Sequence, residues 1–325
     1  MTEVAVLIPC YNEALTIAKV VADFRAALPS ATILVYDNNS TDGTADRACA
    51  AGAVVRSETL QGKGNVVRRM FADVEADIYV LVDGDDTYEA TDAPMLIERL
   101  QRQNLDMING RRVTGVAAAY RPGHRFGNWF LTSMVSKIFG SRLADMLSGY
   151  KVFSRRFVKS FPALASGFEI ETELVVHALE LRMPIAEVDT EYRERPEGSA
   201  SKLRTVRDGM RIMRTIIRMI KEERPLEFFF ALFSITAVLS LVLGSSVVSE
   251  YLQTGLVPRL PTAVLATGMM LLAFILLACG LILDTVTVGR QELKRLHYVM
   301  APPAGPAQKG ERKSGLNSEP VRAVA

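Results

Sequence analysis

Two long stretches without a formal charge constrain this chain more than any other feature. They run from Phe228 to Val248 and from Thr262 to Leu283. At about 1.5 Å per residue, each is long enough for a helix that crosses a hydrocarbon core of roughly 30 Å. Both are apolar all round rather than along one stripe, which favours membrane spans over a pair of buried core helices. The sequence therefore predicts a C-terminal two-helix transmembrane hairpin over residues 226–290.

The charges beside these stretches predict their orientation. The loop between them carries one basic residue, Arg259, whereas the outer ends carry Lys221, Arg224, Arg290, Lys294 and Arg295. Basic residues favour the cytoplasmic side of a span. We therefore expect an integral membrane protein with both termini, and the domain N-terminal to the spans, in the cytoplasm.

Residues 201–225 have a basic, amphipathic pattern. Basic residues recur at steps of three and four on one helical face, beside a neighbouring apolar face. The pattern suits a juxtamembrane helix that lies among anionic headgroups, although a packed helix with a solvated basic face is the alternative. The tail over residues 291–325 is rich in Pro, Gly, Lys and Ser beyond Ala301, which predicts a cytoplasmic and largely disordered segment.

The first 200 residues alternate between strand and helix patterns. All-apolar strands in such an alternation are typical of an α/β fold with a mainly parallel, Rossmann-like sheet and flanking helices. The expected elements are strands at 4–8, 33–36 and 78–82 and helices at 13–27 and 44–51.

Three polar clusters follow three of these strands: PCYNE from Pro9, DNNSTDGT from Asp37 and DGDD from Asp83. Parallel sheets place ligand-binding residues at the carboxyl ends of their strands. Any one cluster could be a solvated turn, but three in register indicate a binding site.

The DGDD cluster suggests a metal. Asp83 and Asp85 are one residue apart at a strand end, where their carboxylates can share a hard divalent cation such as Mg²⁺ and leave positions open for phosphate. Such an ion would neutralise charge on a departing nucleoside diphosphate. A lone D-x-D is common in acidic turns, so the motif depends on its context.

Composition excludes other classes. The formal net charge is +2, so a globally basic surface for nucleic acid is not expected. The three cysteines, Cys10, Cys49 and Cys279, lack metal-ligand spacing and predict reduced thiols. The apolar run near the N-terminus has no preceding basic region and is interpreted as a first strand rather than a signal peptide.

Taken together, the motifs resemble those of family 2 glycosyltransferases of GT-A fold, in the subgroup of dolichyl-phosphate mannose synthase and the bacterial polyprenyl-phosphate glycosyltransferases. The matching pieces span nearly the whole region before the apolar stretches, in the order that the family has them. They are VLIPCYNE, YDNNSTDGT, GKGNVVRRM, LVDGDDTY, NGRR, HRFGN and DMLSGYKVFSR.

The resemblance implies the roles of particular residues. Asp83 and Asp85 would hold Mg²⁺ or Mn²⁺, with Asp85 as the first choice for a direct ligand. The mannose synthases have a Gln where this chain has Thr87, which puts a third protein ligand in doubt. The nucleotide pocket would be lined by Pro9, Tyr11, Glu13, Asp37, Asn39, Lys63 and Asp83.

On the acceptor side, the resemblance implies that Arg112 and Arg125 bind a lipid phosphate, with Asn128 as an additional hydrogen-bond donor. The planar guanidinium group suits bidentate phosphate contacts. A phosphate monoester is already deprotonated near neutral pH, so the nucleophile needs orientation more than a base. Asp145 matches the usual base position, but could instead position a sugar hydroxyl or an arginine. The expected catalytic residues are thus Asp85, Arg112, Arg125 and Asp145.

Other polar residues fit less specific roles. His124 and His177 lack partners at ligand spacing and are interpreted as packing or incidentally exposed residues. Glu169, Glu171 and Glu173 either touch the sugar or the acceptor loop, or reflect the acidic preference of a helix start. The segment 195–202 resembles a mobile active-site loop of the family.

The predicted protein has a GT-A catalytic domain over residues 1–200. Its expected reaction transfers a hexose or N-acetylhexosamine from a nucleotide sugar, UDP-linked rather than GDP-mannose by a slight preference, to undecaprenyl or dolichyl phosphate with inversion. Membrane lipids are further partners, and a homo-oligomer is compatible with two spans. The alternatives are a non-lipid acceptor and a catalytically silent membrane adaptor. A processive polysaccharide synthase is disfavoured because the single tryptophan, Trp129, lies in no Q-x-x-R-W element. A nucleotidyltransferase is disfavoured because it would need a Gly-rich N-terminal loop, and PCYNE is not one.

Overall fold

The computed structural model describes residues 2–113, 144–193, 195–196, 221 and 224–301. The chain divides into two compact units. One comprises residues 1–206 and 294–325, and the other comprises residues 207–293. Arg125, Asn128, His124 and Trp129 lie outside the described residues, as does nearly all of the predicted amphipathic helix at 201–225.

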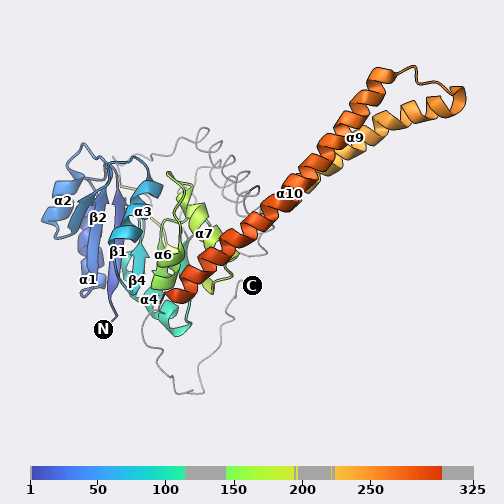
Figure 1. Ribbon diagram of the computed structural model, residues 1–325. Coiled ribbons are helices and arrows are strands. Elements are labelled where there is room, and N and C mark those ends of the chain that lie inside the picture. Colours follow the sequence, from blue (N-terminus) through green and yellow to red (C-terminus); the bar gives the residue numbers. More distant parts are fainter. Residues whose placement is uncertain (1, 114–143, 194, 197–220, 222–223, 302–325) are drawn as a thin grey trace. The chain divides into compact units, whose positions relative to one another are not determined.

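The first unit is built on a seven-stranded sheet (Figure 1). Its strand order is β3-β2-β1-β4-β6-β5-β7. Strand β6 runs antiparallel to both of its neighbours, and the other described pairings are parallel. The mainly parallel sheet that the sequence predicts is therefore confirmed. The strands are β1 Val4–Cys10, β2 Thr32–Asp37, β3 Val54–Ser57, β4 Ile78–Leu81, β5 Met107–Val113, β6 Lys151–Ser154 and β7 Ile185–Glu191.

Helices cover the sheet on both faces. The alternation of side chains along a strand sends Val6 and Ile8 of β1 into the cluster that includes α1, α2 and α4. On the other face, Phe71 of α3 lies edge-on to Tyr79 of β4 and Phe153 of β6, with centroids 6.2 and 5.8 Å apart. The helices of this unit are α1 Ile17–Ala27, α2 Thr44–Ala50, α3 Lys63–Asp73, the short 3-10 helix η1 Ala90–Asp92, α4 Ala93–Arg102, α6 Arg155–Ser160 and α7 Ile170–Glu180.

The first helix begins later than the sequence predicts, at Ile17 rather than Glu13. The reason lies in the backbone of the preceding turn. The Glu13 N–H donates to Thr44 Oγ1 at 2.8 Å and the Ala14 N–H donates to Asp42 Oδ2 at 3.0 Å. These two hydrogen bonds hold the loop after β1 against the loop after β2. Because the N–H groups of Glu13 and Ala14 are bonded to side chains that follow β2, helix α1 begins only after them.

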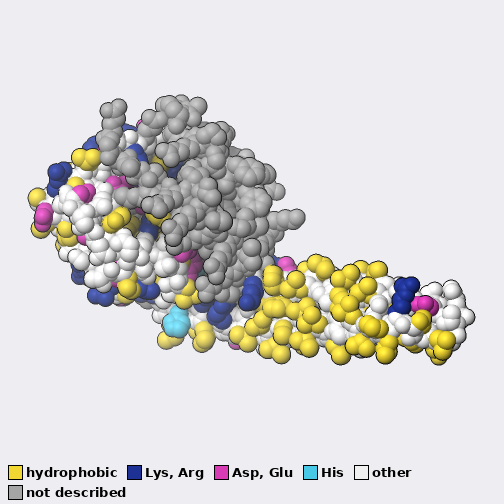
Figure 2. Space-filling model, turned by 90° about the horizontal axis from the view of Figure 1, so that it is seen from above, with side chains coloured by type: hydrophobic (Ala, Val, Ile, Leu, Met, Phe, Trp, Pro, Cys, Tyr) yellow, Lys and Arg dark blue, Asp and Glu magenta, His cyan; other side chains and the backbone are white. Residues whose placement is uncertain are grey.

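The second unit is a helical hairpin. Helix α9 spans Pro225–Thr254 and helix α10 spans Leu260–Met300, so both extend slightly beyond the predicted bounds of 226–290. Both are long and apolar enough to cross a membrane, and only 6% and 17% of their most apolar windows are buried. That exposure is opposite to a soluble core helix. Hydrophobic side chains cover the hairpin on the face in Figure 2.

Small residues hold the two hairpin helices together. The buried positions of α10 recur every seven residues, and Gly280 packs where an added Cβ would lie 2.9 Å from the Cβ of Phe229. Across the hairpin, Ser240 Oγ donates to the carbonyl of Ala266 at 2.7 Å. Close backbone approach and a side-chain hydrogen bond are typical contacts between membrane helices. The buried α10 positions are Ala266, Ala273, Gly280 and Thr287.

The last turns of α10, from Lys294, belong to the first unit. Lys294 Nζ lies 2.6 Å from Glu180 Oε2 in α7, and Tyr298 Oη donates to Asp106 Oδ2 at 2.6 Å. The guanidinium of Arg156 lies over the Tyr298 ring, 5.0 Å from its centroid. Residues 291–300 are thus helical, whereas the sequence placed the tail boundary at 290.

Candidate active site

The polar clusters meet at one edge of the sheet. Cys10 at the end of β1 pairs with Asp37 at the end of β2, and Leu7 pairs with Leu81 at the end of β4. Because β6 runs the opposite way, its first residue, Lys151, pairs with Leu81 at this same edge. The carboxyl ends of β5 and β7 lie there too. The expected gathering of polar clusters at this edge is therefore correct for the described strands.

The loops after β1 and β2 are tied to each other. Asn12 donates its N–H to Ser40 Oγ at 2.8 Å, and its Oδ1 accepts from the Thr41 N–H at 2.8 Å. Asn12 has a φ of 54°, in the left-handed region that asparagine tolerates. These bonds hold the PCYNE and DNNSTDGT segments as one continuous rim.

Asp37 is the most distinctive residue of this rim. It is 8% exposed, its Oδ2 accepts from the Ser40 N–H at 3.1 Å, and its Oδ1 is buried without a hydrogen-bond partner in the part of the chain that the structure describes. A buried carboxylate oxygen without a partner is costly unless a ligand supplies a donor. Nearby on the loop after β1, Glu13 is buried and Tyr11 is 39% exposed.

Asn38 and Asn39 hold the segment that leads into α3. Asn38 Nδ2 donates to the carbonyls of Glu58 and Leu60, at 2.8 and 2.9 Å, and its Oδ1 accepts from the Gly62 N–H at 2.7 Å. Asn39 Nδ2 donates to the Thr59 carbonyl at 2.9 Å. The sequence did not single out Asn38, which is the buried member of the pair. Both amides are therefore engaged within the protein.

Glycines flank Lys63 because the backbone of the 165–166 segment lies against them. An added Cβ at Gly62 or Gly64 would fall 2.2 Å from the carbonyl oxygen of Ser166 or Ala165, respectively. Gly62 also has a φ of 129°, which side-chain-bearing residues rarely adopt. The group that comes close to these glycines is thus the backbone of the protein's own chain.

Lys63 connects the acidic motif to α7. Its Nζ lies 2.5 Å from Asp83 Oδ1 and 2.5 Å from Glu171 Oε1. Burial alone would lower the pKa of Lys63, but the two carboxylates raise it above its ordinary value, so the side chain stays charged. Glu171 also pairs with Lys151, whose Nζ is 2.9 Å from Oε2 and fully buried. Two lysines and two carboxylates therefore form one network.

Asp83 is fixed by what surrounds it. An added Cβ at Gly149 would lie 2.2 Å from its Oδ2, so a larger residue there would displace the carboxylate. Burial would raise the pKa of Asp83, but the charge of Lys63 and its hydrogen bond lower it below the ordinary value. The carboxylate is therefore ionised at neutral pH.

Asp85, the second member of the pair, is 3% exposed and carries two kinds of partner. Thr87 Oγ1 donates to its Oδ1 at 2.6 Å, and Arg195 Nη2 lies 2.5 Å from its Oδ2. The pKa of Asp85 is raised, first by burial and next by the negative charge of Asp83. The two carboxylates are thus close enough to repel each other.

This pair fits a divalent cation. Two ionisable oxygen ligands with mutual repulsion are stabilised by a hard ion such as Mg²⁺ or Mn²⁺. Among the described residues no group of three His, Cys, Asp or Glu side chains could hold a metal, so other ligands would have to come from a bound molecule or water. Thr87 binds Asp85 and supports it.

Arg112, near the carboxyl end of β5, and Asp145, in the segment that precedes β6, form a second charged centre. Arg112 Nε and Nη2 lie 2.7 Å from Asp145 Oδ2 and Oδ1, and the guanidinium lies 5.5 Å from the ring centroid of Tyr192. Burial would raise the pKa of Asp145, but hydrogen bonds and charge from Arg112 lower it. A carboxylate held this way is a weak base and a good anchor for an arginine.

Glu187 of β7 holds the backbone at Asp145 in place. Its carboxylate accepts the N–H groups of Ala144 and Asp145 at 2.9 and 3.0 Å, and the Asn109 amide at 3.0 Å. Asn109 Nδ2 also donates to the Asp145 carbonyl at 2.7 Å. The backbone on both sides of Asp145 is therefore fixed, which fixes Arg112 in turn.

Of the remaining acidic and histidine residues, one belongs to the site and two have structural roles. Glu171 belongs to the site, whereas Glu173 accepts the N–H groups of Leu164 and Ala165 at 2.9 and 2.8 Å. His177 is 2% exposed, with its Nε2 3.1 Å from Ser160 Oγ, and burial lowers its pKa to about 3. The packing interpretation of His177 is therefore confirmed.

Three site residues were not expected to pair as they do. Lys151 is the fourth residue of SGYKVF, and a charged residue at the start of an otherwise apolar strand is a signal for a buried, paired lysine. Glu171 was expected only as an alternative, at a helix start or near the sugar. Arg195 was predicted as part of a loop and not as a partner of Asp85.

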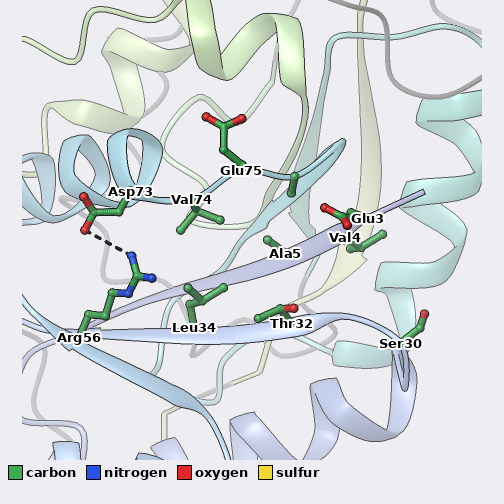
Figure 3. Close-up of a pocket in the computed structure, with 11 residues that line it drawn as sticks. Glu3, Val4, Ala5, Ser30, Thr32, Leu34, Arg56, Asp73, Val74 and Glu75 are labelled. Carbon is green, nitrogen blue, oxygen red and sulfur yellow. Dashed lines mark ion pairs between the residues drawn. The ribbon is translucent and has the colours of Figure 1, made fainter. Parts of the chain in front are cut away.

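A separate cavity lies at the opposite edge of the sheet, where β1 and β2 begin (Figure 3). Glu3, Thr32, Asp73 and Glu75 are among its lining residues, and Arg56 Nη1 lies 3.5 Å from Asp73 Oδ2. No motif of the sequence falls in it, and it is distinct from the edge that carries the acidic pair.

Comparison with known proteins agrees with this geometry. The model of glycosyl transferase family 2 matches residues 5–161. The glycosyltransferase AglJ of Haloferax volcanii is 34% identical over 300 residues, which cover 90% of this chain and 97% of that protein. The chain belongs to glycosyl transferase family 2.

Other relatives of this glycosyltransferase fit the same family. The dolichyl-phosphate hexose transferase of Haloferax volcanii is 27% identical over 222 residues, covering 68% of this chain and 96% of that protein. Among solved structures, glucosyl-3-phosphoglycerate synthase of Mycobacterium tuberculosis matches with a TM-score of 0.54 at 24% identity, covering 68% of this chain and 80% of that one. This likeness confirms the GT-A fold of the family 2 glycosyltransferase.

Proposed function

We propose that this glycosyltransferase moves a hexose or N-acetylhexosamine from a nucleotide sugar to a polyisoprenyl phosphate, with inversion at the donor carbon. The observation that carries the proposal is the meeting of two centres at one sheet edge. One is the acidic pair Asp83 and Asp85 with Lys63, and the other is Arg112 held by Asp145. The two apolar helices supply the means to keep such a chain beside lipid acceptors.

For the donor, the proposal assigns the rim after β1 and β2 to the nucleoside. The unpartnered Oδ1 of Asp37 can accept a base N–H or a ribose hydroxyl. Pro9, Tyr11, Glu13 and Asn39 would complete that pocket. A UDP-sugar is slightly favoured over GDP-mannose. Structures of the mycobacterial synthase hold UDP-glucose with Mn²⁺, which supports a nucleotide-sugar donor and a divalent ion as proposals for this chain.

The residues proposed to hold the metal are Asp83 and Asp85. When bound, Mg²⁺ or Mn²⁺ supplies Lewis-acid stabilisation to the departing diphosphate. Lys63 remains charged beside it and adds a second positive group. Asp83 stays ionised because Lys63 lowers its pKa, so both residues keep the charges that this role needs.

For the acceptor, the proposal gives Arg112 the task of orienting the lipid phosphate. The phosphate is already deprotonated near neutral pH, so no residue must remove a proton from it. Asp145 then acts as the positioning residue for Arg112, because its lowered pKa makes it a poor base. Arg125 and Asn128, which lie outside the described residues, are proposed as further phosphate contacts. The relative named as a dolichyl-phosphate hexose transferase supports a lipid acceptor.

The proposed topology puts the catalytic domain and both termini on the cytoplasmic side. The described loop between the helices carries Arg259, which pairs with Glu250 at 3.3 Å, while the outer ends carry the other basic residues. Labelling single cysteines at the loop and in the catalytic domain of intact cells tests this orientation.

The function is tested by transfer of radiolabel from a panel of UDP- and GDP-sugars into extractable lipid, using purified full-length protein, polyprenyl phosphate and Mg²⁺. Arg112→Ala is compared with Arg111→Ala, its neighbour on β5, which pairs with exposed Asp189 instead. We expect label in lipid from one donor, lost with EDTA, Asp85→Asn or Arg112→Ala and retained in Arg111→Ala.

Two results would redirect the proposal. Label that enters only a water-soluble acceptor would move the function to a non-lipid acceptor. Nucleotide binding without transfer from any donor to any acceptor would favour the silent adaptor.

A further inference from the structure

We propose that Arg195 is the internal counter-ion of Asp85 and makes metal binding depend on the arrival of the donor diphosphate. This inference rests on the proposed function, because it takes Asp83 and Asp85 as the ligands of a divalent cation. It assigns to Arg195 a role in the order of binding.

Both acidic side chains are already neutralised by the protein. Arg195 Nη2 lies 2.5 Å from Asp85 Oδ2, while the other oxygen of Asp85 accepts from Thr87 at 2.6 Å. Asp83 Oδ1 is held by Lys63 at 2.5 Å. Each carboxylate of the pair therefore has one cationic side chain of this chain against it.

A free divalent ion meets two obstacles at such a pair. It must compete with Arg195 for Oδ2 of Asp85, and it must approach the positive charges of Arg195 and Lys63. The described residues supply no third ligand that would compensate for this repulsion. Among them, no group of three His, Cys, Asp or Glu side chains could hold a metal ion. Metal binding without a nucleotide is therefore weak.

The donor diphosphate removes both obstacles. Its negative charges attract the cations that hold the pair, offset their repulsion of the metal and provide further oxygen ligands. Donor and metal then strengthen each other's binding, and by linkage the factor is the same in both directions. The size of this change in affinity depends on which cationic side chain leaves its carboxylate when the donor binds.

The geometry points to Arg195, rather than Lys63, as the residue that gives way. Lys63 is enclosed, with 9% of its side chain exposed, and Glu171 holds it on its other side at 2.5 Å. Arg195 has 29% of its side chain exposed against 4% for Asp85, so it can turn toward water. Lys63 keeps its place while Arg195 exchanges Asp85 for another partner.

The test measures Mn²⁺ affinity of the full-length protein in detergent, by the electron paramagnetic resonance signal of free Mn²⁺, without nucleotide and then with UDP or GDP. The variant is Arg195→Gln. The matched control is Arg193→Gln, two residues away, whose guanidinium pairs with Glu89 and Glu191 instead. Arg195→Lys keeps the charge, and Arg195→Leu repeats its removal should the Gln variant misfold.

We expect Arg195→Gln and Arg195→Leu to bind Mn²⁺ alone about tenfold more tightly than wild type, and the gain from nucleotide to shrink by about the same factor. Arg193→Gln and Arg195→Lys should behave as wild type. If nucleotide promotes Mn²⁺ binding in wild type but Arg195→Gln shows no gain without it, the counter-ion role is wrong and the metal site stands. If no protein binds Mn²⁺ even with either nucleotide, the proposed metal site itself is wrong, and the counter-ion role with it.

Discussion

Replacing Glu171 by Gln removes a carboxylate that two buried lysines, Lys63 and Lys151, share. Lys151 is fully buried and Lys63 nearly so, and both lie within 3 Å of Glu171. Breaking a buried ion pair from one side typically costs about 3–5 kcal/mol, because a charge is left uncompensated. For a unit of this size, 1 kcal/mol corresponds to about 2–4 °C in Tm, so Glu171→Gln should lower the Tm by roughly 6–20 °C.

A second substitution shows whether charge is the cause. Lys151→Met in the Glu171→Gln background removes the surplus lysine and leaves Lys63 facing Asp83, so the network is balanced again. The double variant should therefore be more stable than the sum of the single losses predicts, by about 2 kcal/mol. The assay is thermal unfolding of the full-length protein in detergent at neutral pH, followed by circular dichroism.

The control is Lys19→Met, since Lys19 pairs with Asp23 and Asp86 on the surface with half of its side chain exposed. Such a pair is worth about 0–1 kcal/mol, so its Tm should barely change. Strictly additive losses from Glu171→Gln and Lys151→Met, or a Glu171→Gln protein as stable as the Lys19→Met control, would refute the shared network.

Three further changes probe other features. Gly149→Ala places a Cβ 2.2 Å from Oδ2 of Asp83, so Mn²⁺ affinity with nucleotide should fall about tenfold. Arg112→Lys loses the bidentate pair with Asp145, so kcat/KM for the acceptor should fall about 10–100-fold. Because burial holds the pKa of His177 near 3, below the unfolded value of 6.5, the stability that it contributes is present above pH 6.5 and lost as pH falls. Between pH 7.5 and pH 5 the loss is about 2 kcal/mol, which His177→Leu should abolish in pH-dependent melts.

Each of these has a result that contradicts it. For the glycine, the control is Gly268→Ala in the hairpin, where an added Cβ meets nothing within 4 Å, and equal Mn²⁺ affinity in both variants would refute the contact argument. Wild-type acceptor kinetics in Arg112→Lys would mean that charge alone matters there. A His177→Leu protein with the same acid sensitivity as wild type would place the titrating group elsewhere.

The site edge was predictable from sequence because parallel strands obey a simple rule. Three apolar runs ended in polar clusters, and the carboxyl ends of parallel strands share an edge. The pair Asp83 and Asp85, and the position of Asp37, follow directly from that rule. The candidate spans were equally direct, since their length and uniform apolarity depend on no tertiary contact.

The pairings within the site were not predictable in the same way. Lys63 and Glu171 are more than 100 residues apart, and they meet only because the glycines around Lys63 let the 165–166 backbone come close. The start of α1 shifted for a similar reason, because a loop from the next strand took the N–H groups of Glu13 and Ala14. Such contacts depend on the finished topology rather than on local pattern.

The reversed strand β6 has a consequence for how acceptor preference could diversify. Strand β5 ends at Val113, and the next described strand along the chain, β6, begins at Lys151 at the same edge of the sheet. The described residues on either side of 114–143 include Arg112 and Asp145, which pair with each other, so the two flanks of this part of the sequence are held together. Under the proposed function, chimaeric enzymes that exchange residues 114–143 between relatives test whether this part of the sequence sets acceptor preference while the rest of the chain is unchanged.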